Sequence, residues 1–358
     1  MAHLNPETFM LRAREVCGAE NVLWPDPGSA ICVRPSTTAQ VASLVRSAHE
    51  QGCRIRLGTT AEQGEGACVL LDLQRMNQVV QQDPVSSWVF TQTGITPAQL
   101  EAHLNRDGFT LRCHFAGHGA SPLSTLFSVP VPGFHPGPSI HRLIAVTAVW
   151  PDGSTFRTRV SPRQAVGPDS RTFFAREHGG AAVVTEACLA MFSSAVPSGY
   201  ETLAFFSLSD ALDAAVSLTG RGPLKPLEQA LEFDRERWLL HLWFWGPAAC
   251  VAVARDRAAH RIGLPTGGIQ AQGEGPAREF WQLRPLTDEN PRVARPITAG
   301  ELAQLRPEPG DFVSSFSPGG AILYRVGARQ ADPVFLGESA DPVVRDWLAS
   351  FHESEKNQ

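Results

Sequence analysis

The chain has 358 residues, of which 43% are hydrophobic, and a formal net charge of −5 at pH 7. This length supports a large core and is more typical of two subdomains than of one or three. A negatively charged chain without a basic run lacks the electrostatic surface that binds nucleic acid or an anionic membrane, so neither is an expected partner. The longest uncharged run, residues 238–254, is interrupted by Gly246-Pro247 and does not predict a transmembrane segment.

The seven cysteines are widely spaced, and no two of them form a Cys-x-x-Cys pair. This spacing predicts neither a zinc site nor an iron–sulfur ligand set, and the cysteines are expected to be small buried hydrophobic residues. Residues 1–7 contain no basic segment followed by an apolar stretch, so neither a secretory signal nor a transit peptide is indicated. A cytoplasmic location is therefore expected.

The first third of the chain predicts a β-α-β-loop-β unit that follows an N-terminal helix beginning at Pro6. A short apolar segment at residues 30–33 precedes a helix over residues 36–52, which opens with a Ser-Thr-Thr cap. Two further strands, residues 53–57 and 69–73, flank a glycine-containing loop. Functional residues are expected in that loop.

The middle of the chain predicts a strand, a capped helix and a hairpin. The strand covers residues 88–92, and the Thr-Pro-Ala-Gln sequence at residues 96–99 has the form of a capping box that opens the helix. Apolar residues at 143–150 and 154–158 flank a Pro-Asp-Gly turn, in which proline suits the first corner and glycine suits a positive φ. These segments therefore form a predicted β-hairpin.

The C-terminal half predicts a second subdomain of βαβ type. Strands are expected at residues 203–207 and 239–245, and amphipathic helices at 209–218 and 247–262. Large apolar residues fill both faces of the second strand, which is typical of a strand buried on both sides rather than of a pocket wall. A closing helix is expected over residues 342–352.

Five short segments of the first half stand out together because of their order. They are residues 33–52, 71–77, 93–100, 148–153 and 166–187. This succession resembles the FAD-linked oxidase domain of the vanillyl-alcohol-oxidase type, also called the PCMH type. The resemblance implies an α+β fold, with a PCMH-type FAD-binding domain of two α/β subdomains over residues 1–195. A smaller α+β cap or substrate domain would occupy residues 196–358.

The resemblance also implies an FAD site whose pyrophosphate lies at Arg56, Gly58, Thr59 and Thr60. Backbone N–H groups approach anionic oxygens most closely where no side chain intervenes. The threonine hydroxyls and the arginine would add hydrogen bonds and positive charge. The other cofactor-binding positions that the family pattern implies are Gly94, Gly137, Gly167, Asp169, Gly179, Ala182 and Val183.

Two histidines are candidate catalytic residues. His135 and His141 lie in or beside a proline- and glycine-rich stretch at residues 115–139, which by resemblance passes near the isoalloxazine ring. A histidine there would serve as the base for a 2-hydroxy acid. The alternative is that each is a solvent-facing loop residue, since nothing in the sequence fixes either ring in space.

Other polar residues have both functional and ordinary interpretations. Arg142, Arg157 and Arg171 could hold a substrate carboxylate, or they could be surface residues without a special role. The four-residue spacing of His114 and His118 suits a metal only within a helix, and two glycines in that stretch argue against a helix. No metal site is predicted.

Several features resemble the small FAD-binding subunit of the glycolate oxidase complex. They are the short chain, the absence of a His-x-His motif and the sequence of residues 319–325. This resemblance implies that FAD accepts a hydride from a small 2-hydroxy acid. It also implies partner subunits, including an iron–sulfur subunit, and peripheral association with the inner membrane through such a complex.

A second hypothesis keeps the fold without the flavin. Gly58 is the one glycine left of the family's pyrophosphate cluster, and Ala145 and Ala182 occupy positions where the family carries glycine. Ile140-His141 stands in place of an Arg-Asp pair, and Pro168 in place of a tyrosine. Fold alone does not determine function. A flavin-free structural or regulatory subunit that supports a catalytic homologue therefore stays open.

Overall fold

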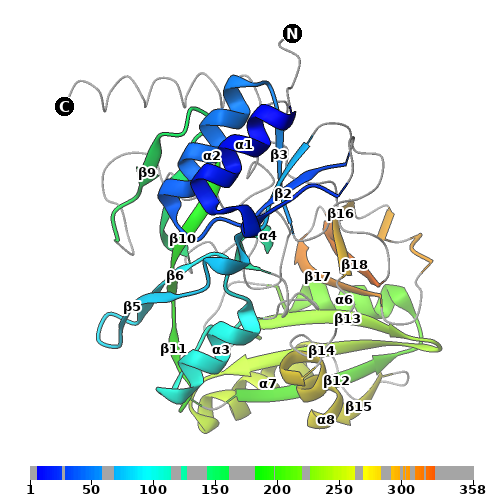
Figure 1. The fold of residues 1–358 in the computed structure, drawn as a ribbon. Coiled ribbons are helices and arrows are strands. Elements are labelled where there is room, and N and C mark those ends of the chain that lie inside the picture. The colour runs from blue at the N-terminus through cyan, green and yellow to red at the C-terminus, as the bar shows by residue number, and fades with distance from the viewer. Residues whose placement is uncertain are drawn as a thin grey trace, which may run out of the picture.

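The fold is α+β, as the sequence predicts, and the residues that the structure describes form four β-sheets (Figure 1). The computed structural model describes residues 6–25, 29–58, 68–113, 122–126, 143–160, 182–196, 198–219, 226–262, 269–283, 292–298, 301–302, 304–306, 311–317 and 320–326. The predicted closing helix at residues 342–352 lies outside these ranges.

The N-terminal unit is a small sheet covered by two helices. Its elements are α1 (Pro6–Cys17), η1 (Ala19–Asn21), β1 (Val22–Leu23), β2 (Ile31–Val33), α2 (Thr38–Glu50), β3 (Arg54–Leu57) and β4 (Cys68–Leu71). The strand order is β1-β2-β4-β3, and both pairings of β4 are parallel. Helix α2 buries Val41, Leu44 and Val45 in the core beneath it, at the spacing of one helical face. The predicted β-α-β-loop-β unit is thereby confirmed.

The second sheet has five antiparallel strands in the order β5-β6-β10-β8-β9. These are β5 (Val79–Asp83), β6 (Trp88–Gln92), β10 (Val183–Ala190), β8 (Leu143–Val149) and β9 (Thr155–Arg157). The predicted hairpin is confirmed as β8–β9, with Gly153 at a φ of 79° in its turn. Strand β10 lies between β6 and β8 and pairs with both, although it follows both of them in the sequence.

Short elements connect these two sheets to the rest of the molecule. They are the 3-10 helix η2 (Leu73–Arg75), α3 (Pro97–Arg106), α4 (Leu123–Leu126) and the two-stranded sheet of β7 (Phe109–Thr110) and β11 (Phe192–Ser193). Helix α3 opens with the predicted capping box, in which the Thr96 hydroxyl accepts from the Gln99 N–H and the Gln99 side chain accepts from the Thr96 N–H.

The C-terminal part forms a seven-stranded sheet in the order β15-β12-β14-β13-β17-β18-β16. Its strands are β12 (Ser198–Phe205), β13 (Glu228–Asp234), β14 (Arg237–Trp245), β15 (Ile269–Gly273), β16 (Arg292–Thr298), β17 (Phe312–Ser317) and β18 (Gly320–Val326). Its helices are α6 (Leu208–Ser217), α7 (Ala248–Ile262), α8 (Glu274–Arg278) and the π-helical turn η5 (Glu279–Leu283).

The predicted βαβ arrangement of this part occurs only in a split form. Strands β12 and β13, which α6 connects, both pair antiparallel with β14, and β14 lies between them. Strand β13 was not predicted as a strand separate from β14. Because that extra strand turns straight back into β14, no two strands of this sheet that the structure describes are parallel neighbours.

The two faces of the seven-stranded sheet have different neighbours. Helices α6 and α7 pack on one face, where Leu240 and Leu242 of β14 contact the buried alanines of both helices. The opposite face carries Tyr200 and Trp243, which share one buried cluster with Leu104 of α3 and other residues of the first half. Strand β14 is therefore buried on both sides, as predicted.

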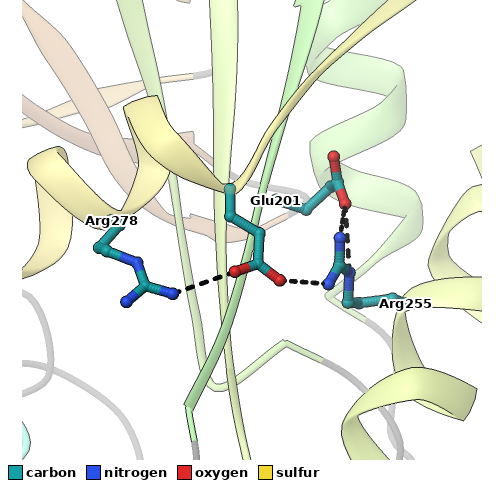
Figure 2. Close-up of polar contacts among 4 residues, drawn as sticks. Glu201, Arg255 and Arg278 are labelled. Atoms are coloured by element: carbon teal, nitrogen blue, oxygen red, sulfur yellow. Dashed lines mark hydrogen bonds and ion pairs between the residues drawn. The ribbon is translucent and has the colours of Figure 1, made fainter.

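An ion-pair network fastens α7 and α8 to strand β12 (Figure 2). The guanidinium of Arg255 donates to Glu201 through two nitrogens and to Glu274 Oε1 at 2.6 Å. Arg278 donates to the other oxygen of Glu274 at 3.1 Å.

None of the helices that the structure describes is both long and apolar enough to cross a membrane.

Candidate FAD site

The carboxyl ends of the parallel strands lie beside the five-stranded sheet. The N–H of Thr93, just past β6, donates to Thr185 O at 3.0 Å, and its hydroxyl donates to Val184 O at 2.6 Å. The next residue, Gly94, donates to Met76 O at 2.8 Å, close after β4 and η2. The end of β6, the start of β10 and the segment after β4 therefore meet at one place. In open α/β units, ligands bind outside the carboxyl ends of parallel strands.

Helix α2 begins at the same edge. Thr37 caps the helix by accepting from the Gln40 N–H, and the Thr38 hydroxyl bonds to the Thr185 hydroxyl at 3.0 Å. The buried carboxylate of Asp72 accepts from Arg34 Nε at 3.1 Å, next to the ends of β2 and β4. These contacts fix the helix N-terminus and the ends of β2 and β4 against β10.

Gly58 is the first residue after β3. Among the described residues, a methyl group there would meet Leu70 Cδ1 at 3.4 Å and no backbone atom, so no described backbone contact demands a glycine. Its φ does not demand one either, since it is not in the positive range. The missing side chain therefore leaves room at the end of β3, and the half-buried Arg56 precedes it with a positive charge. Gly58 and Arg56 fit an anionic group such as the FAD pyrophosphate, although the Gly58 N–H already donates to Leu71 O.

Three of the other expected positions have roles in packing. A methyl group at Gly94 would lie 1.7 Å from Leu73 O, so this glycine is required by a close approach of two backbone segments. Ala182 and Val183 open β10 with buried side chains, each within a hydrophobic cluster. Ala145 is likewise fully buried. The structure gives these positions a packing role.

The remaining predicted site residues lie outside the described part of the chain. They are Thr59, Thr60, Gly137, Gly167, Asp169 and Gly179 for the cofactor, His135 and His141 for catalysis, and His114, His118, Arg142 and Arg171 among the weaker candidates. Arg157 is described, and it is exposed on β9 with its guanidinium 4.9 Å from the centre of the Phe90 ring. No cluster of potential metal ligands occurs among the described residues.

A second polar cluster was missed by the sequence analysis. Thr202, His241 and Glu232 lie on three neighbouring strands of the seven-stranded sheet and are hydrogen-bonded to one another. A sequence signal did exist, because His241 is the one titratable residue inside the apolar strand β14 after its first position. It had no visible partner, since Glu232 belongs to the strand that was not recognised.

The family comparison agrees with this geometry. The FAD binding domain family matches residues 29–159, a range that runs from just before β2 to just beyond β9 and covers a little over a third of the chain. A comparison with curated protein sequences gives no match.

Several solved structures have the same fold. The chain is similar to alkyldihydroxyacetonephosphate synthase, with 17% identity, a TM-score of 0.64, and coverage of 82% of this chain and 66% of that one. It is similar to p-cresol methylhydroxylase with bound substrate, with 14% identity, a TM-score of 0.66, and coverage of 97% and 86%. It is also similar to 4-ethylphenol oxidase from Gulosibacter chungangensis, with 12% identity, a TM-score of 0.64, and coverage of 95% and 84%.

These likenesses establish the fold, and identities this low establish no more than the fold. The chain has the fold of the FAD-linked oxidases of the vanillyl-alcohol-oxidase type and contains a match to their FAD binding domain. The FAD binding domain match supports the binding of FAD. The chain spans slightly less than two thirds of the length of the alkyldihydroxyacetonephosphate synthase that it matches.

Proposed function

We propose that this protein binds FAD at the carboxyl ends of β2, β4 and β3 and uses it to oxidise a small 2-hydroxy acid of the glycolate type. The observation that carries the proposal is the FAD binding domain match over residues 29–159, a range that includes β2, β3, β4 and Gly58. The flavin would supply hydride acceptance, and the protein would supply binding, orientation and electrostatics. Arg56, Gly58 and the two threonines that follow would hold the pyrophosphate.

The substrate class and the partners rest on the resemblance to the small subunit of the glycolate oxidase complex. Reduced flavin must pass its electrons on, and in such a complex an iron–sulfur subunit would accept them. Peripheral association with the inner membrane would then come through the complex.

The first experiment is the visible absorption spectrum of the purified protein, before and after incubation with excess FAD. Near-stoichiometric flavin absorbance that reappears in the supernatant after heat denaturation is the expected result. Anaerobic addition of glycolate or lactate should then bleach the flavin band. A protein that stays colourless after incubation with FAD would contradict the proposal.

A flavin-free subunit is the alternative, and a specific observation favours it. Ala145 and Ala182, which replace family glycines, place their methyl groups in the hydrophobic interior, and the N–H groups of Gly58 and Gly94 are bonded to backbone carbonyls. In that case the protein would stabilise a catalytic homologue, and a partner would co-purify with it. Failure to take up FAD together with a stable partner in pull-downs would select this alternative.

A further inference from the structure

The Thr202, His241 and Glu232 cluster is a polar array inside an otherwise apolar sheet. His241 Nδ1 lies 3.2 Å from the Thr202 hydroxyl, and Nε2 lies 3.1 Å from Glu232 Oε2. The three residues are 0%, 1% and 7% exposed for Thr202, His241 and Glu232 respectively. Among the described residues this is the one acid–base pair in which both side chains are buried.

The strand register explains how the three side chains meet. Thr202 of β12 is the direct cross-strand partner of His241 of β14, and on the other side His241 faces Ala230 of β13. Because alanine is small, the side chain of Glu232, two residues further along the same face, reaches the imidazole diagonally. The neighbours on this face, Tyr200 and Trp243, belong to the cluster shared with the FAD-binding half. The array therefore lies on the side of the sheet that faces that half.

The array is ordered as a hydroxyl, an imidazole and a carboxylate. When Nε2 carries the proton and donates a hydrogen bond to Glu232, Nδ1 is unprotonated. Nδ1 then accepts a hydrogen bond from a hydroxyl, here that of Thr202. A carboxylate in this position holds the ring in one tautomer and stabilises the imidazolium that forms when Nδ1 takes a proton. Buried polar groups cost free energy unless they are hydrogen-bonded, and here each of the three side chains has a partner.

A second feature concerns what covers the imidazole. The ring of Phe280 stacks on it with centroids 4.6 Å apart and an interplanar angle of 14°. Phe280 belongs to the π-helical turn η5, and π-turns are rare and frequent at functional sites. Phe280 in turn packs edge-on against Trp281 and Phe312. A ligand that reached Nδ1 would require this aromatic cover to move.

We propose that Thr202, His241 and Glu232 form the acid–base site for the substrate hydroxyl, and that Phe280 on the π-helical turn closes that site. The substrate hydroxyl takes the place of the Thr202 hydroxyl at Nδ1. As the substrate CH–OH becomes C=O, the O–H proton passes to Nδ1, and the flavin, when bound, would accept the hydride from carbon. His241 is the catalytic residue and Glu232 is a positioning residue that acts through it. This inference rests on the proposed function for its oxidant.

The test is calorimetric binding of glycolate and of acetate, which has the carboxylate but no hydroxyl to donate to Nδ1. The wild-type protein should bind glycolate about 3- to 10-fold more tightly than acetate. His241→Gln, which removes Nδ1, should lose this preference, whereas His260→Gln, an exposed histidine on α7, should behave as wild type. An undiminished preference in His241→Gln, or no glycolate binding by the wild type and Phe280→Ala, would overturn the inference.

Two further variants address folding and closure. Thermal unfolding of His241→Gln is compared first, and Glu232→Gln provides a variant of the same shape that leaves the histidine in place. Glu232→Gln should lower the preference for glycolate over acetate, and an unchanged preference would count against the array. Phe280→Ala should accelerate glycolate association, and an unchanged association rate would remove the gate from the proposal.

The flavin content of each variant, read from its absorbance, separates the two proposals. In flavin-loaded protein, His241→Gln should lower the rate of flavin reduction by glycolate about 10²-fold or more. A histidine-dependent preference for glycolate in a protein without flavin would refute the proposed oxidase function alone. Flavin-loaded protein that lacks this preference would refute the acid–base site alone.

Discussion

The imidazole of His241 lies nearly parallel to the ring of Phe280, with their centroids 4.6 Å apart. His241 thus has two kinds of neighbour, since its ring face contacts an aromatic ring while its edge nitrogens bond to Thr202 and Glu232. A replacement that satisfies only one of these contacts leaves the other incomplete. This dual environment leads to a stability prediction for the pair of His241 and Glu232.

Removing one member of the pair should cost more than removing both. Glu232→Leu leaves Nε2 of His241 buried without its acceptor, so we expect a loss of about 2 kcal/mol in the free energy of unfolding. The double variant Glu232→Leu with His241→Leu removes both polar groups and should recover part of that loss. Urea unfolding of the three proteins measures the coupling. Strictly additive effects would show that the two side chains do not depend on each other.

Gly94 and Gly58 should respond differently to the same substitution. Gly94→Ala places a methyl group against Leu73 O and should destabilise the protein by about 3 kcal/mol, because two backbone segments must separate. Gly58→Ala meets only Leu70 Cδ1 and should change stability by less than about 1 kcal/mol. If the space at Gly58 holds a pyrophosphate, FAD uptake should still fall in Gly58→Ala. Chemical denaturation and a flavin titration measure the two effects.

Arg255 should matter more to stability than Arg278, although both bind Glu274 (Figure 2). Arg255→Met leaves the carboxylates of Glu201 and Glu274 without their shared cation, at an expected cost of about 1–2 kcal/mol given their partial exposure. Arg278 and Glu274 form a more exposed pair one helical turn apart, so Arg278→Met should cost only about 0.5 kcal/mol. Thermal unfolding in low and high salt provides the measurement. Equal losses in the two variants would contradict the ranking.

Cys188 should make the protein less stable at high pH. Burial raises the pKa of this thiol to about 12 from an ordinary value of 9.0, against a smaller lowering by Arg157. Below pH 9 the thiol is protonated in both the folded and the unfolded chain, and its contribution is fully present. As the pH rises from 9 towards 12, the unfolded chain releases the proton first, so stability falls by about 1.4 kcal/mol per pH unit.

Replacing Cys188 tests this assignment. Cys188→Ala should show a shallower decline in the free energy of unfolding between pH 8 and pH 10.5 than the wild type. Cys250→Ala, at an exposed position on α7, is the matched control and should follow the wild type. The slope against pH is the quantity to compare, since both substitutions also change packing. Identical slopes in Cys188→Ala and the wild type would rule out the thiol as a source.

The capping box of α3 provides a smaller and local prediction. Thr96→Ala removes the side-chain acceptor for the Gln99 N–H, and we expect a loss of about 1 kcal/mol. Thr96→Ser keeps a hydroxyl at the same place and should retain most of the stability. Denaturant unfolding midpoints of the two variants make the comparison. A serine variant as unstable as the alanine variant would show that the methyl group, rather than the hydroxyl, matters.

Local features were predicted well because neighbouring residues determine them. The cap at Thr96, the turn at Gly153 and the buried face of α2 depend on hydrogen bonds and periodicities that span only a few residues. The ordered succession of five family-like segments added the fold by resemblance. The split arrangement of β12, β14 and β13 was missed because four of the seven residues of β13 are polar and its turn into β14 has no glycine or proline.

The sequence by itself determined the α+β class, the helix caps, the β8–β9 hairpin and the candidate pyrophosphate position at Gly58. Only the tertiary structure showed that Gly94 is required by a backbone carbonyl and that Thr202, His241 and Glu232 meet. The physical reason is the range of the interactions. Caps and turns are closed within a few residues, whereas contacts across a sheet depend on strand order and register, which distant segments settle together.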